Sequence, residues 1–538
     1  MNERRETTTI RPGASSICVL APIRHLTSPP ITISLRQKDD GTTILTAHEE
    51  ELLNARRALR VASWASVFYL ITTDILGPFN APFAFSQVGY APGAILYLVM
   101  GVAACYTGLL LWHLFIRLDS NRYPVRTYAD LAERIFGRWA KYGCSVLQSL
   151  QLIINVGTIC LSNGQAVEQI AGNHQFCFSV CILIWTFVGM FIGQIRTLKN
   201  YGWLANSAVW LNLLIIFISM GFISHSPPNI AAAQAAYGPS IGDGPVVKSA
   251  FVSQPLFSKV NGDVDCGIRA AELVGIVFAY GGAMIFPEFM AEMRRPMDFW
   301  KGMVCAQLLI STVYLMYGLF VYSFQGQYTL PLAYQGVSKQ SWQDVGNVIS
   351  LITGVIAAGL YGNIGIKVAY INLVEEWAKG PSLLSRKGHV IWSGMVIVYW
   401  ALAYIIASAI PQVQTISGLV AAICIMQFTY TFPPLFILGY QMILDAGGPN
   451  DPGDTWADFS RWRRGFWTGM GGVDGDGNGA VGEKEVWKKR GWKCFNLVLF
   501  LGAASMACLG MYGSGMSIKN TFASGAAATS FGCKSPVG

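Results

Sequence analysis

The stretch Glu272–Pro296, which reads ELVGIVFAYGGAMIFPEFMAEMRRP, places a glycine pair between two apolar segments. It predicts an apolar helix that breaks at Gly281-Gly282, resumes for about two turns and ends at Arg294-Arg295. A soluble core helix needs no such break, whereas a membrane tolerates broken backbone where protein or a water-filled cavity satisfies the freed peptide groups. Discontinuous spanning helices of this kind mark binding sites near the middle of the bilayer. The alternative is that the glycines only let a neighbouring helix pack closely.

The composition indicates a chain that lies mostly in lipid. Of its 538 residues, 53% are hydrophobic and 13% are charged, whereas soluble domains carry about a quarter of charged residues. The net charge of +8 does not by itself indicate nucleic-acid binding, because its location matters more than its size. The 12 cysteines are scattered without a CxxC pair, which is typical of packing. Three of them, Cys177, Cys266 and Cys533, fall near one side of the membrane. One disulfide between two of these three is the alternative to packing.

Apolar stretches of about 20 residues, long enough to span a bilayer, recur eleven times and predict an all-α polytopic membrane protein. We place them near residues 62–86, 93–116, 143–167, 176–195, 203–225, 270–292, 300–324, 345–372, 390–410, 414–441 and 493–514. Lys and Arg concentrate in alternate connections, with six in 117–142 and none in 87–92. Because basic residues are retained in the cytoplasm, we expect a cytoplasmic amino terminus and an extracytoplasmic carboxyl terminus.

The spans predict five regions. We expect residues 1–50 to form a disordered cytoplasmic tail, because they are rich in Thr, Ser, Pro and charge. They contain no clean apolar segment before a cleavage site, so no signal peptide is expected. Residues 51–445 form the transmembrane core with helices 1–10, and 446–492 a cytoplasmic insert. Residues 493–514 form helix 11, and 515–538 a short extracytoplasmic tail.

The connection Thr127–Gly137, TYADLAERIFG, predicts a short amphipathic helix. Thr127 and Asp130 match a capping box, and Gly137 stands where a helix commonly ends. The apolar residues at helical spacing are Tyr128, Leu131, Ile135 and Trp139. Such a helix either lies on the cytoplasmic surface of the membrane or packs on the helix bundle.

The first span contains a second interruption, at Thr72–Pro78. Proline suits the first turn of a helix, so Gly77-Pro78 predicts an end followed by a restart. Helices 1 and 6 are therefore both discontinuous, and they lie five spans apart and enter the membrane from opposite sides. This topology predicts a 5+5 inverted repeat with helix 11 left over.

The two interruptions offer complementary chemistry. The restart after Pro78 turns free amides near Phe79 and Asn80, and the positive end of a helix dipole, towards a carboxylate. Unwound carbonyls at Thr73-Asp74 and at Phe278-Ala279-Tyr280 suit an ammonium group. Together with Gly77, Gly281 and Gly282, these residues predict a site for a zwitterion such as an amino acid. Carriers of nucleobases, cations and osmolytes also use broken helix pairs.

Charged and polar residues at membrane depth are candidates for function. Asp74 is either a proton-sensitive or amine-facing group or a cap of the broken backbone. Glu288 is expected to cap the restarted helix rather than to act in catalysis. Lys367 either takes the place of a coupling sodium ion, which would make the protein proton-driven, or extends towards the interface. A polar stripe in helix 3 must turn inward, either to line a permeation path or to join helices: Gln148, Gln151, Asn155, Thr158 and Ser162.

The segment Asp474–Glu485, DGDGNGAVGEKE, fits the pattern of an EF-hand calcium loop. Its ligands would be Asp474, Asp476, Asn478, the Ala480 carbonyl and Glu485. The preceding GMGG cannot form an entering helix and no partner loop is present, so the alternative is a flexible acidic insert. We expect neither a cofactor nor a resident metal site.

Three segments carry a family resemblance: 278–296, 75–90 (ILGPFNAPFAFSQVGY) and 127–137. They resemble the amino acid/auxin permease family, and in particular its fungal neutral amino-acid permeases, over residues 50–445 and the last helix. The resemblance implies eleven spans in a LeuT-type fold and proton-coupled uptake of neutral or aromatic amino acids. It also implies substrate contacts at the 73–78 and 278–282 breaks. The long insert at 446–492 departs from the family pattern.

These observations predict a secondary active transporter that carries a neutral amino acid with protons by alternating access. The sequence contains no ATP-binding loop, so an ion gradient should supply the energy for transport. An enzyme would need a cluster of catalytic residues, and only His113 lies well inside a span, so we expect no catalytic residue. A further alternative is a receptor that keeps the transporter fold and senses amino acids. We expect an integral protein of the plasma membrane rather than the vacuolar membrane, with no obligate protein partner.

Overall fold

The computed structural model describes most of the predicted membrane region. The described residues are 36–37, 43–44, 60, 62–75, 77–120, 124–172, 177–195, 198–237, 244–250, 258–260, 263–265, 280–330, 332–381, 383, 385–409, 418–445, 466, 483–523 and 531–533. Phe278, Ala279, Cys266 and Asp474–Gly482 lie outside them. The predictions that rest on those residues, including the calcium-like loop, therefore stay predictions.

The described chain is mostly helical. Its longer helices are α2 (Trp64–Ile75), α3 (Ala81–Val88), α4 (Tyr90–Leu118), α5 (Tyr128–Phe136), α6 (Arg138–Ala171), α7 (Phe178–Ile192), α8 (Leu198–Ser224), α9 (Ile230–Tyr237), α11 (Phe286–Glu292), α12 (Phe299–Gln325), α13 (Gln340–Ala369), α14 (Arg386–Ala409), α16 (Phe432–Asp445) and α18 (Glu483–Ala523). Short 3-10 helices include η1 (Pro78–Asn80), η3 (Ala283–Ile285), η4 (Pro296–Asp298), η5 (Gly326–Tyr328) and η6 (Ala333–Gly336). Three segments are π-helical: η7 (Tyr370–Trp377), η8 (Ala421–Ile425) and η9 (Gln427–Thr431). Two short antiparallel hairpins pair β1 (Arg36–Gln37) with β2 (Thr43–Ile44) and β3 (Ser258–Val260) with β4 (Asp263–Asp265).

Eight helices among the described residues are long and apolar enough to cross a membrane, which makes the protein an all-α polytopic membrane protein. They are residues 90–118, 138–171, 204–224, 296–328, 340–375, 386–409, 418–445 and 487–516, and each overlaps a predicted span. Two shorter apolar helices, 64–73 and 178–192, overlap the predicted first and fourth spans. Of the predicted sixth span, only its end from Tyr280 is described. The count of eleven and the inverted repeat stay predictions.

The chain divides into two compact units, one formed by 1–31 and 438–498 and the other by 32–437 and 499–538. In the smaller unit, Lys493 forms an ion pair with Asp445, and the Asn496 side chain donates to the Trp492 carbonyl (2.9 Å). Helix α18 begins ten residues before the predicted span at 493. The first turns of α18 contain Glu and Lys, which favour a helix. The prediction counted only apolar residues, so it did not include these polar turns.

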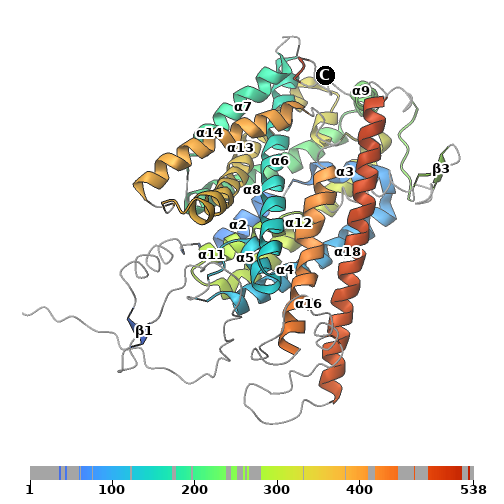
Figure 1. Ribbon diagram of the computed structural model, residues 1–538. Helices are drawn as coiled ribbons and strands as arrows, with labels where there is room; N and C mark the ends of the chain where they lie inside the picture. The colour runs from blue at the N-terminus through green and yellow to red at the C-terminus, as the bar shows by residue number, and fades with distance from the viewer. Residues whose placement is uncertain are drawn as a thin grey trace, which may run out of the picture. The chain divides into compact units, whose positions relative to one another are not determined.

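In the larger unit, α6, α7, α13 and α14 pack against one another (Figure 1). They share one buried hydrophobic cluster that contains several aromatic side chains. Trp392 and Trp400 of α14 are fully buried there, beside Tyr399. A β-carbon at Gly189 of α7 would lie 2.1 Å from the Trp400 ring. The absence of a side chain at this glycine therefore lets α7 approach α14.

Helix α5 confirms the predicted capping box and corrects one residue. The Asp130 amide donates to the Thr127 hydroxyl (3.3 Å), and the Thr127 amide donates to the Asp130 carboxylate (3.1 Å). Gly137 ends the helix with φ +85°, a conformation that suits glycine. Tyr128, Leu131 and Ile135 are buried, so α5 packs on the bundle rather than lying free on a surface. The prediction for Trp139 is wrong: it belongs to α6 and is 89% exposed, because Gly137 resets the helical phase.

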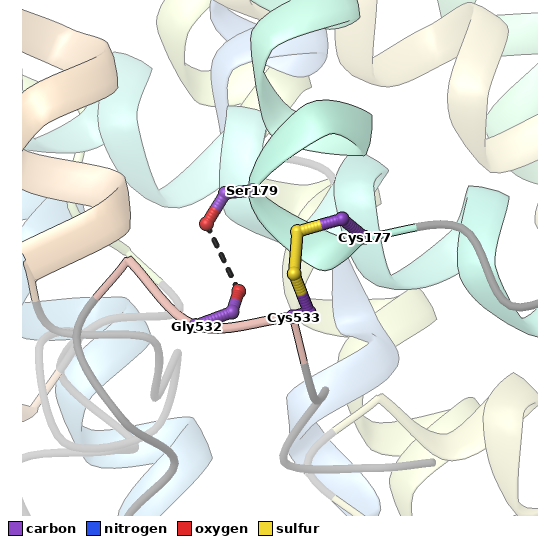
Figure 2. The surroundings of a disulfide bond; sticks show 4 residues. All are labelled: Cys177, Ser179, Gly532 and Cys533. Carbon is purple, nitrogen blue, oxygen red and sulfur yellow. Dashed lines mark hydrogen bonds between the residues drawn. A yellow bond between two sulfur atoms is a disulfide. The ribbon is translucent and has the colours of Figure 1, made fainter.

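A disulfide joins Cys177 to Cys533, 356 residues apart in sequence, and ties residues 531–533 to the start of α7 (Figure 2). Backbone and side-chain bonds accompany it. The Ser179 hydroxyl donates to the Gly532 carbonyl (3.0 Å), and the Phe178 amide donates to the Cys533 carbonyl (3.3 Å). The amide of Phe531 donates to the Ser408 carbonyl at the end of α14 (2.9 Å). The sequence left this bridge open among three cysteines.

Candidate functional site

The first interruption lies between α2 and α3. Helix α2 ends at Ile75, Gly77 is not helical, and the chain resumes as η1 and then α3. The Gly77 amide donates to the Tyr314 hydroxyl of α12 (3.3 Å). One turn earlier, the Thr73 hydroxyl donates to the Ala205 carbonyl of α8 (2.9 Å). The prediction of unwound backbone at Thr73-Asp74 is wrong: both residues lie in the last turn of α2, where carbonyls have no intrahelical donor. The Asp74 side chain lies outside the described part of the structure.

The restart after this interruption places a polar side chain, that of Asn80, at the start of α3. The first amides of a helix have no intrahelical acceptor, and Asn80 occupies the N-cap position of α3 without a side-chain capping bond. Its Oδ1 is buried and has no hydrogen-bond partner among the described residues. The start of α3 therefore holds a buried side-chain acceptor, Asn80 Oδ1, that the described residues do not satisfy.

The second interruption is described from Tyr280 onward. Tyr280, Gly281 and Gly282 form a turn, followed by η3 and then by α11. The Gly282 amide donates to the Tyr280 carbonyl (3.1 Å), and Tyr280 is 1% exposed. Its hydroxyl donates to the Tyr97 carbonyl of α4 (2.9 Å). The backbone from 280 to 282 is thus not α-helical, which fits the predicted break.

Tyr314 contacts both interruptions. Its hydroxyl accepts the Gly77 amide, and its ring centroid lies 6.1 Å from that of Tyr280. The Tyr97 ring lies 6.0 Å from Tyr314 and 6.3 Å from Tyr280, which completes a buried group of three tyrosines. The two interruptions therefore meet at α12, although they are about 200 residues apart in sequence.

Phe79 of η1 belongs to a second aromatic group. It is 8% exposed, and its ring meets Tyr317 and Tyr334 edge to face at 6.0 Å and 5.0 Å. The hydroxyls of these tyrosines bond Ser219 (3.1 Å) and Ser350 (2.8 Å). Burial raises the pKa of Tyr334 to about 12, so its hydroxyl stays neutral at physiological pH. The group presents an apolar wall with neutral polar edges.

The polar stripe of α6 turns inward as predicted. Gln148 and Gln151 are fully buried, and Asn155 and Thr158 are 7% and 8% exposed. The Asn155 carbonyl accepts the Thr158 hydroxyl (2.9 Å). Both amide atoms of Gln151 are buried without a hydrogen-bond partner among the described residues. The side-chain amide of Gln151 is therefore available to a partner outside the described residues.

The predicted ion-coupling residue Lys367 is paired. Its ammonium lies 2.6 Å from the Glu292 carboxylate, with side-chain exposures of 13% and 16%. The pair joins α13 to the end of α11. A small cavity elsewhere is lined by Cys160, Asn163, Trp185, Gly189, Val355, Ala358 and Trp400, and none of the predicted substrate residues lines it.

Sequence reasoning missed Tyr97, Tyr314 and Tyr317, and it did not predict that Glu288 caps α5. A buried tyrosine needs a partner for its hydroxyl, so Tyr97, Tyr314 and Tyr317 inside predicted spans were a usable signal. Glu288 lies in the first turn of α11, but its carboxylate accepts the amide of Tyr128 at the start of α5 (3.2 Å). The cap of its own helix stays a prediction, and the structure adds a cap of α5. The capped helix, α5, packs beside α11 but begins 160 residues before Glu288 in the sequence.

The long apolar helices and the two interrupted segments define a polytopic α-helical membrane protein. Residues 60–441 match the model of the family described as transmembrane amino acid transporter protein. The chain belongs to this family, and both interruptions lie inside the matched range.

Relatives agree with this membership. The chain is 25% identical over 382 residues to an N amino acid transport system protein of Neurospora crassa, covering 69% of this chain and 74% of the relative. A transmembrane transporter of Fusarium pseudograminearum is 23% identical over 385 residues, covering 70% and 75%. Lysine histidine transporter-like 1 of Arabidopsis thaliana is 22% identical over 297 residues, covering 52% and 59%.

Proposed function

We propose that this protein is a secondary active transporter that carries neutral amino acids, aromatic ones included, together with protons. Family membership supports an amino acid as the substrate. The observation that carries the finer proposal is the contact of Tyr314 with both interruptions, since it brings a helix restart and a non-helical turn to one place.

In this proposal the substrate carboxylate binds at the start of α3, beside Phe79 and Asn80. The ammonium binds backbone carbonyls at Thr73-Asp74 and at Phe278-Ala279-Tyr280. A site of this kind selects a zwitterion because each charged end finds peptide groups of the opposite polarity. The glycines Gly77, Gly281 and Gly282 leave the backbone open to approach, and the rings around Phe79 suit a neutral side chain.

Transport would follow alternating access in an eleven-span, LeuT-type 5+5 repeat, in which one half rocks against the other about the interruptions. Asp74 and Lys367 are the coupling groups that the sequence suggests. The ion pair of Lys367 with Glu292 favours a role in holding α11 to α13.

We propose that the protein lies in the plasma membrane. In the proposed orientation, the amino terminus is in the cytoplasm. The Cys177–Cys533 disulfide supports it, because disulfides persist on the oxidising side of a membrane. Both cysteines belong to regions that the distribution of basic residues puts outside.

The test is uptake into proteoliposomes that contain the purified chain. A labelled neutral amino acid is offered at external pH 5 and pH 8 against a fixed internal pH, with a panel of unlabelled amino acids as competitors. We expect accumulation only with the inward proton gradient, and competition by neutral and aromatic amino acids. Binding without accumulation would instead identify a receptor.

A further inference from the structure

Glu288 is a carboxylate that the proposed substrate site does not use. It lies in the first turn of α11, directly after the second interruption, and the residue is 9% exposed. An ionised carboxylate inside a membrane bundle is costly unless a cation or several donors compensate it.

The two oxygens of Glu288 have different surroundings. Oε1 accepts the Gln148 side-chain amide of α6 (2.6 Å) and the Tyr128 backbone amide of α5 (3.2 Å). Oε2 is buried and has no hydrogen-bond partner among the described residues, and the same holds for Oε1 of Gln148. Both orphaned atoms are acceptors. A proton on Oε2 would supply the donor that this group lacks and would leave the two existing bonds intact.

The charges around Glu288 do not replace that proton. Lys141 of α6 is taken by Glu133 (2.9 Å) and Asp130 (3.5 Å) of α5. On α11 itself, Glu292 is paired with Lys367 of α13. The Tyr128 hydroxyl donates to the Phe428 carbonyl of η9 (3.0 Å), and Asp130 adds a further negative charge on α5. Within the described part of the chain, no cation forms an ion pair with Glu288.

The hydrogen bonds of Glu288 depend on where α11 lies. Gln148 also donates to the Met284 carbonyl (2.9 Å), so it ties both η3 and α11 to α6. The glycine pair precedes these segments. A movement of α11 away from α5 and α6 would break the bonds to Oε1 and admit water, which favours the ionised form. The position of α11 and the protonation of Glu288 are therefore linked.

We propose that Glu288 carries the co-transported proton, an inference that rests on the proposed proton symport. The proton adds to Oε2 when the site faces the acidic side. It leaves to water when the site faces the cytoplasm and the movement of α11 breaks the hydrogen bonds to Oε1, and no other covalent bond forms or breaks. Gln148 and the amino end of α5 are the positioning groups that hold Oε1.

The test compares Glu288→Gln with wild type in proteoliposomes by two measurements. Exchange of labelled for unlabelled amino acid needs binding and conformational change without net proton movement. Accumulation under an imposed proton gradient needs both. Glutamine resembles the protonated acid, so exchange should stay within about twofold of wild type and lose its dependence on pH. Gradient-driven accumulation and substrate-induced proton uptake should fall at least about tenfold.

The matched control is Glu133→Gln, a carboxylate on α5 that pairs with Lys141, and it should keep proton-driven accumulation. If Glu288→Gln accumulates substrate like wild type, the inference is wrong. If Glu288→Gln also loses exchange while the purified protein stays monodisperse, Glu288 serves only as the cap of α5, and the inference is equally overturned. If wild type itself shows no proton-driven accumulation, it is the proposed symport that fails.

Discussion

At the scale of single residues, the account depends on polar groups whose partners lie far away in sequence. Tyr314 joins Gly77 to Tyr280, and Glu288 caps α5. The sequence shows that such groups stand at membrane depth and must be satisfied. It does not show which partner each group finds, because that choice depends on how the helices pack.

Replacing Tyr314 with phenylalanine removes the hydroxyl that accepts the Gly77 amide and keeps the ring against Tyr280. A neutral hydrogen bond contributes about 1 kcal/mol, so we expect the KM for the transported amino acid to rise roughly fivefold. Uptake kinetics measure it. The control Tyr142→Phe, at an exposed position of α6, should leave KM unchanged. An unchanged KM in Tyr314→Phe would remove Tyr314 from the site.

The ion pair of Lys367 with Glu292 predicts a double-mutant result. Either Lys367→Met or Glu292→Gln leaves a partly buried charge without its partner, and each should lower the free energy of unfolding by roughly 1–3 kcal/mol. The double variant should recover part of that loss, because no charge is then left alone. Thermal melting in detergent measures all three. Additive losses would show that the pair does not stabilise the protein.

At the scale of elements, the interruptions and the close approaches between helices follow from glycine and proline. The sequence predicted the breaks at Gly77-Pro78 and Gly281-Gly282, because these residues disfavour a continuous helix. It also predicted the capped helix α5 and the inward face of α6. It misplaced Trp139 and the start of α18, because a periodic pattern does not show where a positive-φ glycine resets the phase or how far polar turns continue.

Gly281→Leu should abolish uptake and leave surface expression largely intact. A leucine in the Tyr280–Gly282 turn adds bulk and favours helix at the point where the proposed site needs open backbone. Uptake and surface labelling measure the two quantities separately. Gly394→Leu on α14, where a β-carbon meets open space, should behave like wild type. Normal uptake in Gly281→Leu would count against a substrate site at this break.

Gly302 of α12 allows a close approach between α12 and α2. A β-carbon at Gly302 would lie 2.7 Å from the Trp64 backbone carbonyl, so Gly302→Val must push the two helices apart. Overpacking of this kind costs about 1–3 kcal/mol, and we expect a lower melting temperature and reduced uptake. A melting temperature equal to that of Gly394→Leu would contradict the close approach.

At the scale of the whole molecule, two regions distant in sequence are joined covalently. The Cys177–Cys533 bridge closes a loop of more than 350 residues, and long loops confine the unfolded chain most in the entropic model. The sequence could place both cysteines on one side of the membrane from the charges of the connections. It could not choose their pairing, since spacing does not determine which cysteines meet.

Cys177→Ser and Cys533→Ser should each lower the free energy of unfolding by about 2–4 kcal/mol, and the double variant should lose no more than either one. A reducing agent should destabilise wild type and leave the variants unaffected. In Cys177→Ser, the freed Cys533 should react with a membrane-impermeant maleimide added outside intact cells. Labelling only after permeabilisation would reverse the proposed orientation.

The central claim is that the two interruptions form one amino-acid site. Equilibrium binding of a labelled neutral amino acid to the purified protein tests it most directly, with one variant at each interruption: Asn80→Ala and Gly281→Leu. The account predicts that each variant weakens binding at least about tenfold while Gly394→Leu binds like wild type. Wild-type affinity in both Asn80→Ala and Gly281→Leu would show that the substrate binds elsewhere.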